Sequence, residues 1–480
     1  MDDMSSPIKF GTSGWRAIIA EDFTLANVKK AVEAIARYVT STNPARPSRS
    51  GGPSLIVGYD TRFLSEKFAA MSAELLASHG IHCYLSQQAV PTPAIACAIR
   101  RLKTDGAINF TASHNPAHYN GVKFSTPDGA PAMTGVTQKV EAWLDNDSPP
   151  QLPEKPAAVE SVDLQPAYLE EIAQKVNLDL IRSAGLRLAY DPLYGTGIGY
   201  IDGLLAQAGI EAVSVHNWRD VLFGGHPPEP DGEHLGELRQ AMQQSRAHLG
   251  LATDGDADRF GIVDESGTFI SPNHILALLL DYLIESRRWT AEEGWTGGAA
   301  KSVATTHLID AVAKFHRIAV YETPVGFKHI GEMIQQDKLV LGGEESAGLT
   351  IRHHVPEKDG ILACLLTAEM VASRGMPLDR QIQELFGKVG SYYPGRWSVP
   401  LTETLKKRFV ERSKQEYSDF QGRRVVKTVR MDGLKLLLDD GSWVLFRLSG
   451  TEPVCRLYCE ASTEKGLEEL AATARRFLFD

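Results

Sequence analysis

The sequence of 480 residues has few cysteines, and none of them forms a Cys-x-x-Cys pair. Cys83, Cys97 and Cys364 are widely separated, and Cys455 and Cys459 would lie too far apart on an extended strand to form a disulfide. Buried or inert thiols are therefore expected, and the compartment is expected to be reducing.

Signals for export or membrane insertion are also missing. The opening residues 1–6 contain neither a basic segment nor an apolar one, and the best later candidate, His274 to Ile284, is too short to span a bilayer. These absences predict a cytoplasmic protein.

The chain has no excess of basic residues. Its net charge of −10 argues against nonspecific binding to nucleic acid or to an anionic membrane, although a local basic pocket for phosphate remains compatible with it. With 43% hydrophobic and 23% charged residues the chain is expected to be globular. Its length predicts roughly three or four domains.

An internal repeat organises the first three quarters of the chain. Residues 55–60 (LIVGYD) are echoed by residues 186–191 (LRLAYD), and residues 75–81 are echoed at nearly the same offset by residues 204–210. Each copy predicts a strand, a loop, a helix with a glycine cap and a second strand, and a fainter copy runs through residues 301–321. We therefore predict an α/β fold with three similar tandem domains built on mixed sheets.

The tail has a different pattern, which predicts a smaller α+β domain. A basic helix is expected over residues 405–420, short strands over 434–438, 443–447 and 455–459, and a closing helix over 463–477. A Pro-, Asp- and Glu-rich segment over residues 145–156 and a break near Gly267 separate the earlier units. The expected domains are residues 1–152, 153–265, 266–390 and 391–480.

The stretch Thr111-Ala112-Ser113-His114-Asn115-Pro116 follows the apolar run 107–110. A strand that ends in small polar residues and Asn-Pro predicts that Ser113 lies on an exposed loop at the strand's end, where a nucleophile would sit. An ordinary turn is the alternative reading of these residues alone.

A second motif, DGDADR, contains Asp254, Asp256 and Asp258. In an extended loop alternate residues face the same way, so the three carboxylates can converge on a hard cation, with Mg²⁺ the first choice. An EF-hand is rejected because Arg259 stands where a glycine is needed and because strands, not helices, are expected on both sides. A solvated acidic turn remains the alternative.

Further loops offer groups for anions and sugars. The segment 10–16 (FGTSGWR) places two glycines beside Arg16, although a β-turn is the alternative. The segment 342–348 (GGEESAG) offers carboxylates and a hydroxyl for sugar hydroxyls, with a helix start as the alternative. The segment 447–453 (RLSGTEP) combines a guanidinium, two hydroxyls and a glycine, which suits a phosphate.

The motifs TASHNP, DGDADR, GEESAG and RLSGTEP, in this order, resemble those of the α-D-phosphohexomutase family, and GTSGWR, TPVGFK and EKDG agree with them. The resemblance covers nearly the whole chain. Within the family the loop Gly343-Glu344-Glu345-Ser346 is most similar to that of phosphoglucomutases.

This resemblance implies four domains around a deep central cleft, with Ser113 carried as a phosphoserine whose phosphate completes the coordination of Mg²⁺ held by Asp254, Asp256 and Asp258. It implies that Arg16, His114, Lys123 and Arg259 line the reacting centre, and it leaves open whether Lys123 or His114 moves the proton. The substrate-binding residues it implies are Thr12, Ser13, Gly326, Lys328, Glu344, Ser346, Lys358, Arg447, Ser449, Gly450 and Thr451.

The reaction implied is the interconversion of glucose 1-phosphate and glucose 6-phosphate through glucose 1,6-bisphosphate, which is also the expected activator. The expected partner is a phosphorylated sugar, with no nucleic acid or membrane, and the protein is expected to be a monomer or homodimer. A phosphomannomutase, a dual-specificity phosphohexomutase and a sugar-phosphate phosphatase remain open. The loop before Lys123 is shorter than its counterpart in animal phosphoglucomutases, so the placement of Lys123 also remains open.

Overall fold

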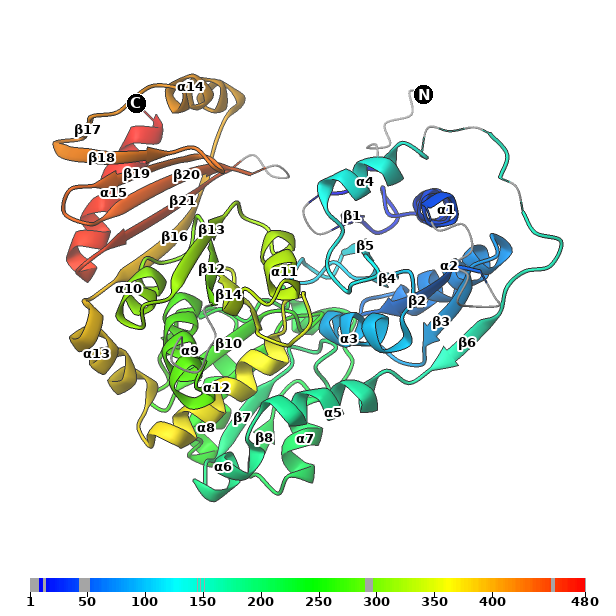
Figure 1. Cartoon of the computed structure of the whole chain (residues 1–480), viewed down its shortest axis with the longest axis horizontal. Helices are drawn as coiled ribbons and strands as arrows, with labels where there is room; N and C mark the ends of the chain where they lie inside the picture. Colours follow the sequence, from blue (N-terminus) through cyan, green and yellow to red (C-terminus); the bar gives the residue numbers. More distant parts are fainter. Residues whose placement is uncertain are drawn as a thin grey trace.

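The computed structural model describes residues 8–11, 14–42, 52–144, 146, 148–150, 152–289, 297–449 and 454–479. The described chain contains four β-sheets, each the centre of one domain, which we call domains I to IV in chain order. Domain I, in blue and cyan, and domain IV, in orange and red, lie on opposite sides of domains II and III (Figure 1). The predicted fold class is confirmed.

Domain I is a mixed sheet in the order β1-β5-β4-β2-β3-β6. Its elements are β1 (Trp15–Ile18), α1 (Leu25–Thr42), β2 (Ser54–Tyr59), α2 (Ser65–Ser78), β3 (His82–Ser86), α3 (Thr92–Leu102), β4 (Ala107–Phe110), β5 (Tyr119–Ser125), α4 (Thr134–Glu141) and β6 (Val159–Val162). The strands β2, β3, β4 and β6 pair in parallel, whereas β5 is antiparallel to β1 and β4. Because β6 lies beyond residue 152, this sheet extends past the predicted boundary of the first domain.

Domain II has five strands in the order β11-β10-β9-β7-β8. Its elements are α5 (Gln165–Lys175), α6 (Leu178–Ser183), β7 (Leu188–Asp191), α7 (Ile201–Gln207), β8 (Ala212–Ser214), η1 (Phe223–Gly225), α8 (Gly236–Ser245), β9 (Leu249–Thr253), β10 (Phe260–Asp264) and β11 (Phe269–Ile270). The antiparallel pair β9 and β10 brackets the acidic motif, as the sequence predicts.

Domain III has four strands in the order β13-β12-β14-β15. Its elements are α9 (Pro272–Arg287), β12 (Gly298–Ser302), α10 (Leu308–Phe315), β13 (Ala319–Thr323), α11 (Lys328–Gln335), β14 (Leu339–Glu344), β15 (Gly348–Ile351), α12 (Gly360–Arg374) and α13 (Leu378–Val389). The sugar-loop motif is the turn between β14 and β15, which form an antiparallel hairpin and not a helix start.

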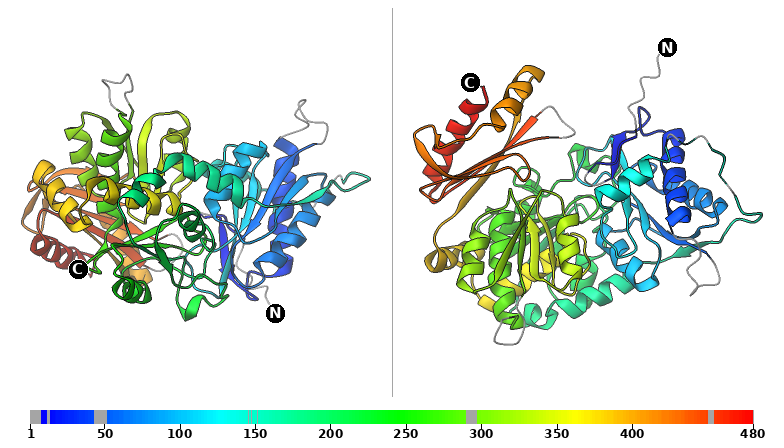
Figure 2. Two further views of the ribbon diagram at one scale, coloured as in Figure 1. Left: turned by 90° about the horizontal axis from the view of Figure 1, so that it is seen from below. Right: turned by 45° about the horizontal axis from the view of Figure 1, so that its top comes forward.

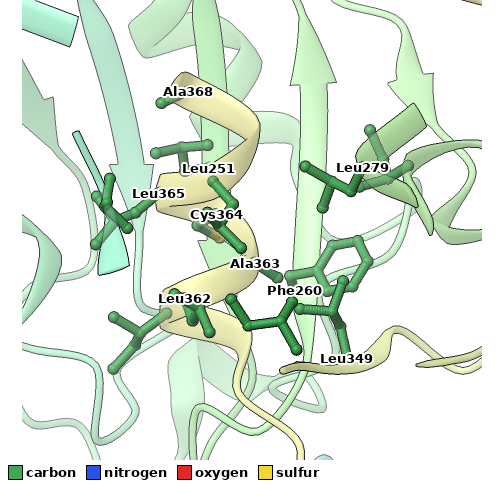
Figure 3. Close-up of a cluster of buried hydrophobic side chains, with 14 of the residues drawn as sticks. Leu251, Phe260, Leu279, Leu349, Leu362, Ala363, Cys364, Leu365 and Ala368 are labelled. Atoms are coloured by element: carbon green, nitrogen blue, oxygen red, sulfur yellow. The ribbon is translucent and has the colours of Figure 1, made fainter. Parts of the chain in front are cut away.

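Helix α12 joins domains II and III. It is buried along most of its length, and it packs against β9 and β10 of domain II as well as against α9 and β15 of domain III. Figure 3 shows Leu362, Cys364 and Leu365 of this helix among side chains that include Leu251 and Phe260. A helix that is apolar all round belongs in a core. The two domains therefore share one hydrophobic core, into which α3 of domain I also packs.

Domain IV has its own core and a sheet in the order β16-β21-β20-β19-β18-β17. Figure 2 shows this domain, in orange and red, next to the green and yellow domain III. Its elements are β16 (Tyr393–Pro400), α14 (Glu403–Ser413), β17 (Asp419–Phe420), β18 (Arg423–Val429), β19 (Leu434–Leu438), β20 (Trp443–Leu448), β21 (Val454–Ala461) and α15 (Glu464–Phe479). The predicted helix over 405–420 is wrong at its end, because Phe420 is a buried strand residue that packs on Phe446 and Phe477.

The five cysteines are all buried and unpaired, as predicted. Burial raises the pKa of the Cys83 thiol to about 12, so this thiol is a poor nucleophile. Among the described residues no single helix is long and apolar enough to cross a membrane; α12 and α13 meet the criterion only when joined across a bend of 77°.

Candidate active site

The Ser113 loop connects β4 to β5 at the edge of the domain I sheet that faces domain II. Ser113 adopts a left-handed backbone conformation with φ of 53°, and its N–H donates to Thr111 Oγ1 at 2.9 Å. The loop sits at the end of a strand, as predicted, but it is not exposed at Ser113, whose side chain is only 1% accessible. Ser113 is covered because the acidic loop of domain II lies against it.

The acidic loop, residues 254–259, is a tight turn and not the extended segment that the sequence suggested. Ala257 has φ of 56°, and its N–H donates to Asp254 O at 2.9 Å. A Cβ on Gly255 would lie 2.6 Å from Ser113 O, so only glycine allows the two loops to approach this closely. The turn brings the three aspartates together, although by a different geometry from the one predicted.

The three aspartates form a pocket that suits a hard cation. Asp254, Asp256 and Asp258 are fully buried, and each offers a carboxylate oxygen within 4.8 Å of the others. Oδ1 of Asp256 and Oδ1 of Asp258 have no hydrogen-bond partner among the described residues. Buried carboxylate oxygens without a partner are costly unless a cation binds them, so this donor set fits Mg²⁺.

Ser113 points directly at this pocket. Its Oγ donates to Asp254 Oδ2 at 2.7 Å and lies 3.3 Å from His114 Nδ1. Burial and the neighbouring carboxylates of Asp256 and Asp258 raise the pKa of Asp254 well above its ordinary value. The hydroxyl is thus adjacent to the candidate metal ligands, which is the arrangement that the family resemblance implies.

Two lysines from different domains meet the same carboxylates. Lys123 Nζ lies 2.5 Å from Asp256 Oδ2 and 3.0 Å from Asp258 Oδ2, and Lys358 Nζ lies 2.8 Å from Asp258 Oδ2. Burial disfavours the charged form of Lys123, but the two carboxylates outweigh it and raise its pKa above the ordinary value. Despite the short loop before it, Lys123 therefore reaches the acidic cluster.

The remaining residues predicted for the reacting centre surround Ser113. Arg16 donates through one terminal nitrogen to Asn115 Oδ1 at 2.6 Å, and the Arg259 backbone N–H donates to Asp254 Oδ1 at 3.0 Å. Burial, together with the positive charges of Arg259 and Arg16, lowers the pKa of His114 well below its ordinary value. His114 is thus a neutral imidazole at neutral pH, whereas Lys123 is charged.

The sugar-loop residues divide into two groups. Glu344 Oε1 accepts from the N–H of Gly326 at 2.7 Å, which ties the hairpin to the 323–328 loop. Burial and the neighbouring Glu345 raise the pKa of Glu344 to about 7. Glu345 instead accepts from Ser302 Oγ at 2.8 Å within domain III.

Ser346 lines a cavity of about 520 Å³ between domains II, III and IV. Arg259 lines it from domain II, and Arg396 and Trp397 line it from domain IV. This cavity is next to the acidic loop and is large enough for a sugar phosphate.

Two predicted substrate residues make contacts elsewhere. Lys328 Nζ donates to Thr134 Oγ1 of α4 at 2.7 Å, which links domain III to domain I. Arg447 Nε lies 2.8 Å from Asp432 Oδ2, and the same carboxylate oxygen accepts from Val325 N at 3.1 Å. Arg447 is therefore connected to the 323–328 loop through Asp432, whereas Lys328 is not directed at the acidic cluster.

Four predicted residues, Thr12, Ser13, Gly450 and Thr451, lie outside the described residues. Their neighbours are described: Gly11 N donates to Gly14 O at 2.9 Å, and Ser449 N donates to Val454 O at 3.0 Å.

Sequence reasoning missed three residues that build the site. Thr92, at the start of α3, donates to Asp256 Oδ2 at 2.6 Å, and Glu229 lies 3.5 Å from an Arg259 terminal nitrogen. Arg62 is fully buried beneath the Ser113 loop. The one sequence signal for Arg62 was its place two residues after Asp60, just past an apolar strand, because a carboxylate at such a position requires a charged partner.

Models of the four domains of one family match the chain. Domain I (alpha/beta/alpha) of phosphoglucomutase/phosphomannomutase matches residues 7–151, domain II residues 166–267, domain III residues 271–389 and the C-terminal domain residues 405–476. The chain belongs to the phosphoglucomutase/phosphomannomutase family of the α-D-phosphohexomutases. It is accordingly an enzyme of the isomerase class, an intramolecular phosphotransferase.

Individual relatives carry different substrate names. A probable phosphoglucosamine mutase of Methanopyrus kandleri is 32% identical, over 96% of this chain and 95% of that protein. Phosphoglucomutase-1 of Homo sapiens is 29% identical, over 96% and 91%. The crystal structure of a putative phosphomannomutase from Thermus thermophilus has a TM-score of 0.84 at 33% identity, covering 99% of this chain and 100% of that one.

Proposed function

We propose that this protein is a phosphoglucomutase, which interconverts glucose 1-phosphate and glucose 6-phosphate through phospho-Ser113 and glucose 1,6-bisphosphate. The observation that carries the proposal is the 2.7 Å contact between Ser113 Oγ and Asp254 Oδ2 in a buried pocket. A serine hydroxyl next to three convergent carboxylates is the arrangement needed to hold a phosphoryl group beside a divalent cation.

Asp254, Asp256 and Asp258 would hold Mg²⁺, which when bound neutralises charge on the transferring phosphoryl group. Ser113 Oγ gives its phosphoryl group to O6 of glucose 1-phosphate, and the proton of that hydroxyl passes to a nearby base. In the second half-reaction the phosphoryl group on O1 moves to Ser113 Oγ, and O1 recovers a proton. The net reaction leaves the enzyme phosphorylated and releases glucose 6-phosphate.

The protonation states favour a division of labour between the two candidates for proton transfer. His114 is neutral and can accept a proton, whereas Lys123 is charged and can donate one. Arg16 and Arg259, whose positive charges act on the neighbouring His114, would stabilise the negative charge of the phosphoryl group. We assign acceptance of the O6 proton to His114 and donation of a proton to O1 to Lys123; loss of a proton from His114 to solvent and uptake of one by Lys123 restore both groups before the next turnover.

The sugar must bind in two orientations, because both of its ends react at Ser113. Glu344 and Ser346 would accept or donate to its hydroxyls, with Lys358 nearby. The Arg447 loop would hold the phosphate that is not reacting, since a guanidinium and backbone N–H groups suit a phosphate dianion. Glucose 1,6-bisphosphate would then serve both as intermediate and as the activator that phosphorylates the enzyme.

A phosphoglucosamine or phosphomannose substrate is the second candidate. The relative from Methanopyrus kandleri is named a probable phosphoglucosamine mutase. In addition Glu345, which makes the loop resemble that of phosphoglucomutases, accepts hydrogen bonds from Ser302 and Thr305 and thereby supports the hairpin. Glu345 therefore supports the hairpin, so its presence is weaker grounds for choosing glucose phosphate over glucosamine or mannose phosphate than the motif alone suggests.

A substrate panel tests the proposal. Glucose 1-phosphate, mannose 1-phosphate, glucosamine 1-phosphate and ribose 1-phosphate are each assayed with Mg²⁺ and the matching bisphosphate, while inorganic phosphate is measured in parallel. We expect the highest kcat/KM for glucose 1-phosphate and negligible phosphate release. A higher kcat/KM for glucosamine or mannose phosphate would make that sugar phosphate, and not glucose 1-phosphate, the preferred substrate. Stoichiometric phosphate release would identify a phosphatase.

A further inference from the structure

Arg62 is a fully buried arginine that no motif contains, and its guanidinium lies beneath the loop carrying Ser113. It belongs to the turn after β2, and it is 51 positions from Ser113 in the sequence. One terminal nitrogen donates to Ser113 O at 2.7 Å and to Asn115 O at 2.6 Å. The other donates to Pro116 O at 2.8 Å and to Tyr119 O at 3.1 Å.

The fifth donor of this guanidinium, Nε–H, donates to Asp60 Oδ2 at 3.0 Å. A guanidinium has five N–H groups in a rigid plane, so every donor of Arg62 is used, and four of the five act on the serine loop. Asp60 is in turn fixed, because its Oδ1 accepts from the Arg62 backbone N–H at 3.0 Å and from Ser65 Oγ at 2.9 Å. The Arg62 guanidinium is therefore held at every donor, and its partner Asp60 is held as well.

Domain II covers the other face of the Arg62 guanidinium. The ring of Phe223 lies 4.9 Å from the Arg62 guanidinium carbon, and Arg219 donates to Thr61 O at 3.0 Å and to Arg62 O at 3.2 Å. The same guanidinium thus contacts the phosphate-carrying loop of domain I and the domain that supplies the acidic cluster. A displacement of Arg62 would shift Ser113 relative to Asp254.

We propose that Arg62 is a positioning residue for phosphoryl transfer: four of its hydrogen bonds hold the Ser113 loop in the strained backbone conformation that aims Oγ at the acidic cluster, and the fifth fixes the guanidinium on Asp60. The inference rests on the proposed role of Ser113 as phosphoryl carrier. Ser113 has φ of 53°, a conformation that a non-glycine residue keeps only when its surroundings enforce it. Four carbonyl oxygens gathered on one cation supply that enforcement without touching substrate.

The test replaces Arg62 with lysine, which keeps the positive charge but has a single nitrogen that cannot reach four carbonyls and Asp60 together. We expect Arg62→Lys to slow phosphorylation of Ser113 by glucose 1,6-bisphosphate, and kcat, by about a hundredfold, the cost typical of a misplaced reacting group. The KM for glucose 1-phosphate should stay within about threefold, because no sugar contact is lost. Hydrogen–deuterium exchange should increase over residues 111–119 and not over β2 or β4.

Arg374→Lys is the matched control, since Arg374 is a largely buried arginine that lies 2.7 Å from Asp281 in domain III, away from the site. It should phosphorylate at the wild-type rate, even if its melting temperature falls. Should Arg62→Lys not fold, Phe223→Leu keeps all five hydrogen bonds and removes only the aromatic face. It should slow phosphorylation by about three- to tenfold, the range of a buried cation–π contact, with KM unchanged.

The outcomes separate the two claims. If wild-type enzyme takes no phosphate on Ser113, the proposed function fails and the inference with it. If wild-type enzyme is phosphorylated but the folded Arg62 variant, or Phe223→Leu in its place, reacts at the wild-type rate, only the positioning role fails. A rise in KM with unchanged kcat would also overturn that role.

Discussion

Arg447→Ala tests the proposal that domain IV holds the phosphate that is not reacting. The Arg447 side chain is 20% exposed and is oriented by the 2.8 Å contact of its Nε with Asp432 Oδ2. A charge-assisted hydrogen bond to phosphate contributes about 1.5–3 kcal/mol. Loss of the guanidinium should therefore raise the KM for glucose 1-phosphate by roughly ten- to a hundredfold. The Asp432 carboxylate, left without its arginine, would repel the phosphate, so the rise in KM should lie towards the upper end of that range.

The assay follows three quantities during turnover by the Arg447 variant. Phosphorylation of Ser113 by bisphosphate should persist, KM should rise, and free glucose 1,6-bisphosphate should accumulate because the intermediate is released before it reorients. Arg423→Ala, which removes a more exposed arginine 3.1 Å from Asp440 in the same sheet, is the control and should change none of them. A wild-type KM without bisphosphate release would refute the placement of this loop, and a hydrolase with a purely structural domain IV predicts that result.

Three further predictions concern the metal, the sugar loop and the thiols. Asp256→Asn removes one anionic ligand and one partner of Lys123, so Mg²⁺ affinity measured by calorimetry and kcat should fall together, by at least about tenfold; unchanged activity after chelation and desalting would leave the acidic loop without a metal role. Because burial raises the pKa of Glu344 to about 7, its carboxylate is lost as pH falls, so KM should rise between about pH 8 and pH 6 in wild type but not in Glu344→Gln; parallel pH profiles of KM would contradict this role. All five thiols are buried, so a thiol reagent should titrate none in the native enzyme and five after denaturation, and rapid native labelling would disprove the packing.

Much of the fold follows from local patterns. The strands β9 and β10, expected on both sides of the acidic motif, and helix α10, within the faint repeat over residues 301–321, are found because short apolar runs and helical apolar spacing coincide there with burial. The edge strand β16 and the strand β18 were missed, because nearly all of their residues are exposed or half-buried, so neither shows a buried face.

The candidate site was predictable as a set of motifs but not as a geometry. Small residues and aspartates indicate the Ser113 and Asp254 loops, because the functional residues of each loop are neighbours in the sequence. The support for those loops is not local: Thr92 reaches Asp256 across 164 positions of sequence, and Arg62 reaches Ser113 across 51. The Thr92 contact arises from the docking of domain I on domain II, and the Arg62 contact arises within the folded domain I; no window of sequence describes either. Burial of Ser113 was unforeseen for the same reason.

The central claim is that Ser113 carries the phosphoryl group, and intact-protein mass spectrometry combined with turnover tests it most directly. Wild-type enzyme incubated with glucose 1,6-bisphosphate and Mg²⁺ should gain the mass of one phosphate, map it to Ser113, and lose it to glucose 1-phosphate on a chase. Ser113→Ala should show neither the added mass nor mutase turnover. Full turnover by Ser113→Ala, or a phosphate that maps elsewhere and exchanges with the sugar, would contradict the account.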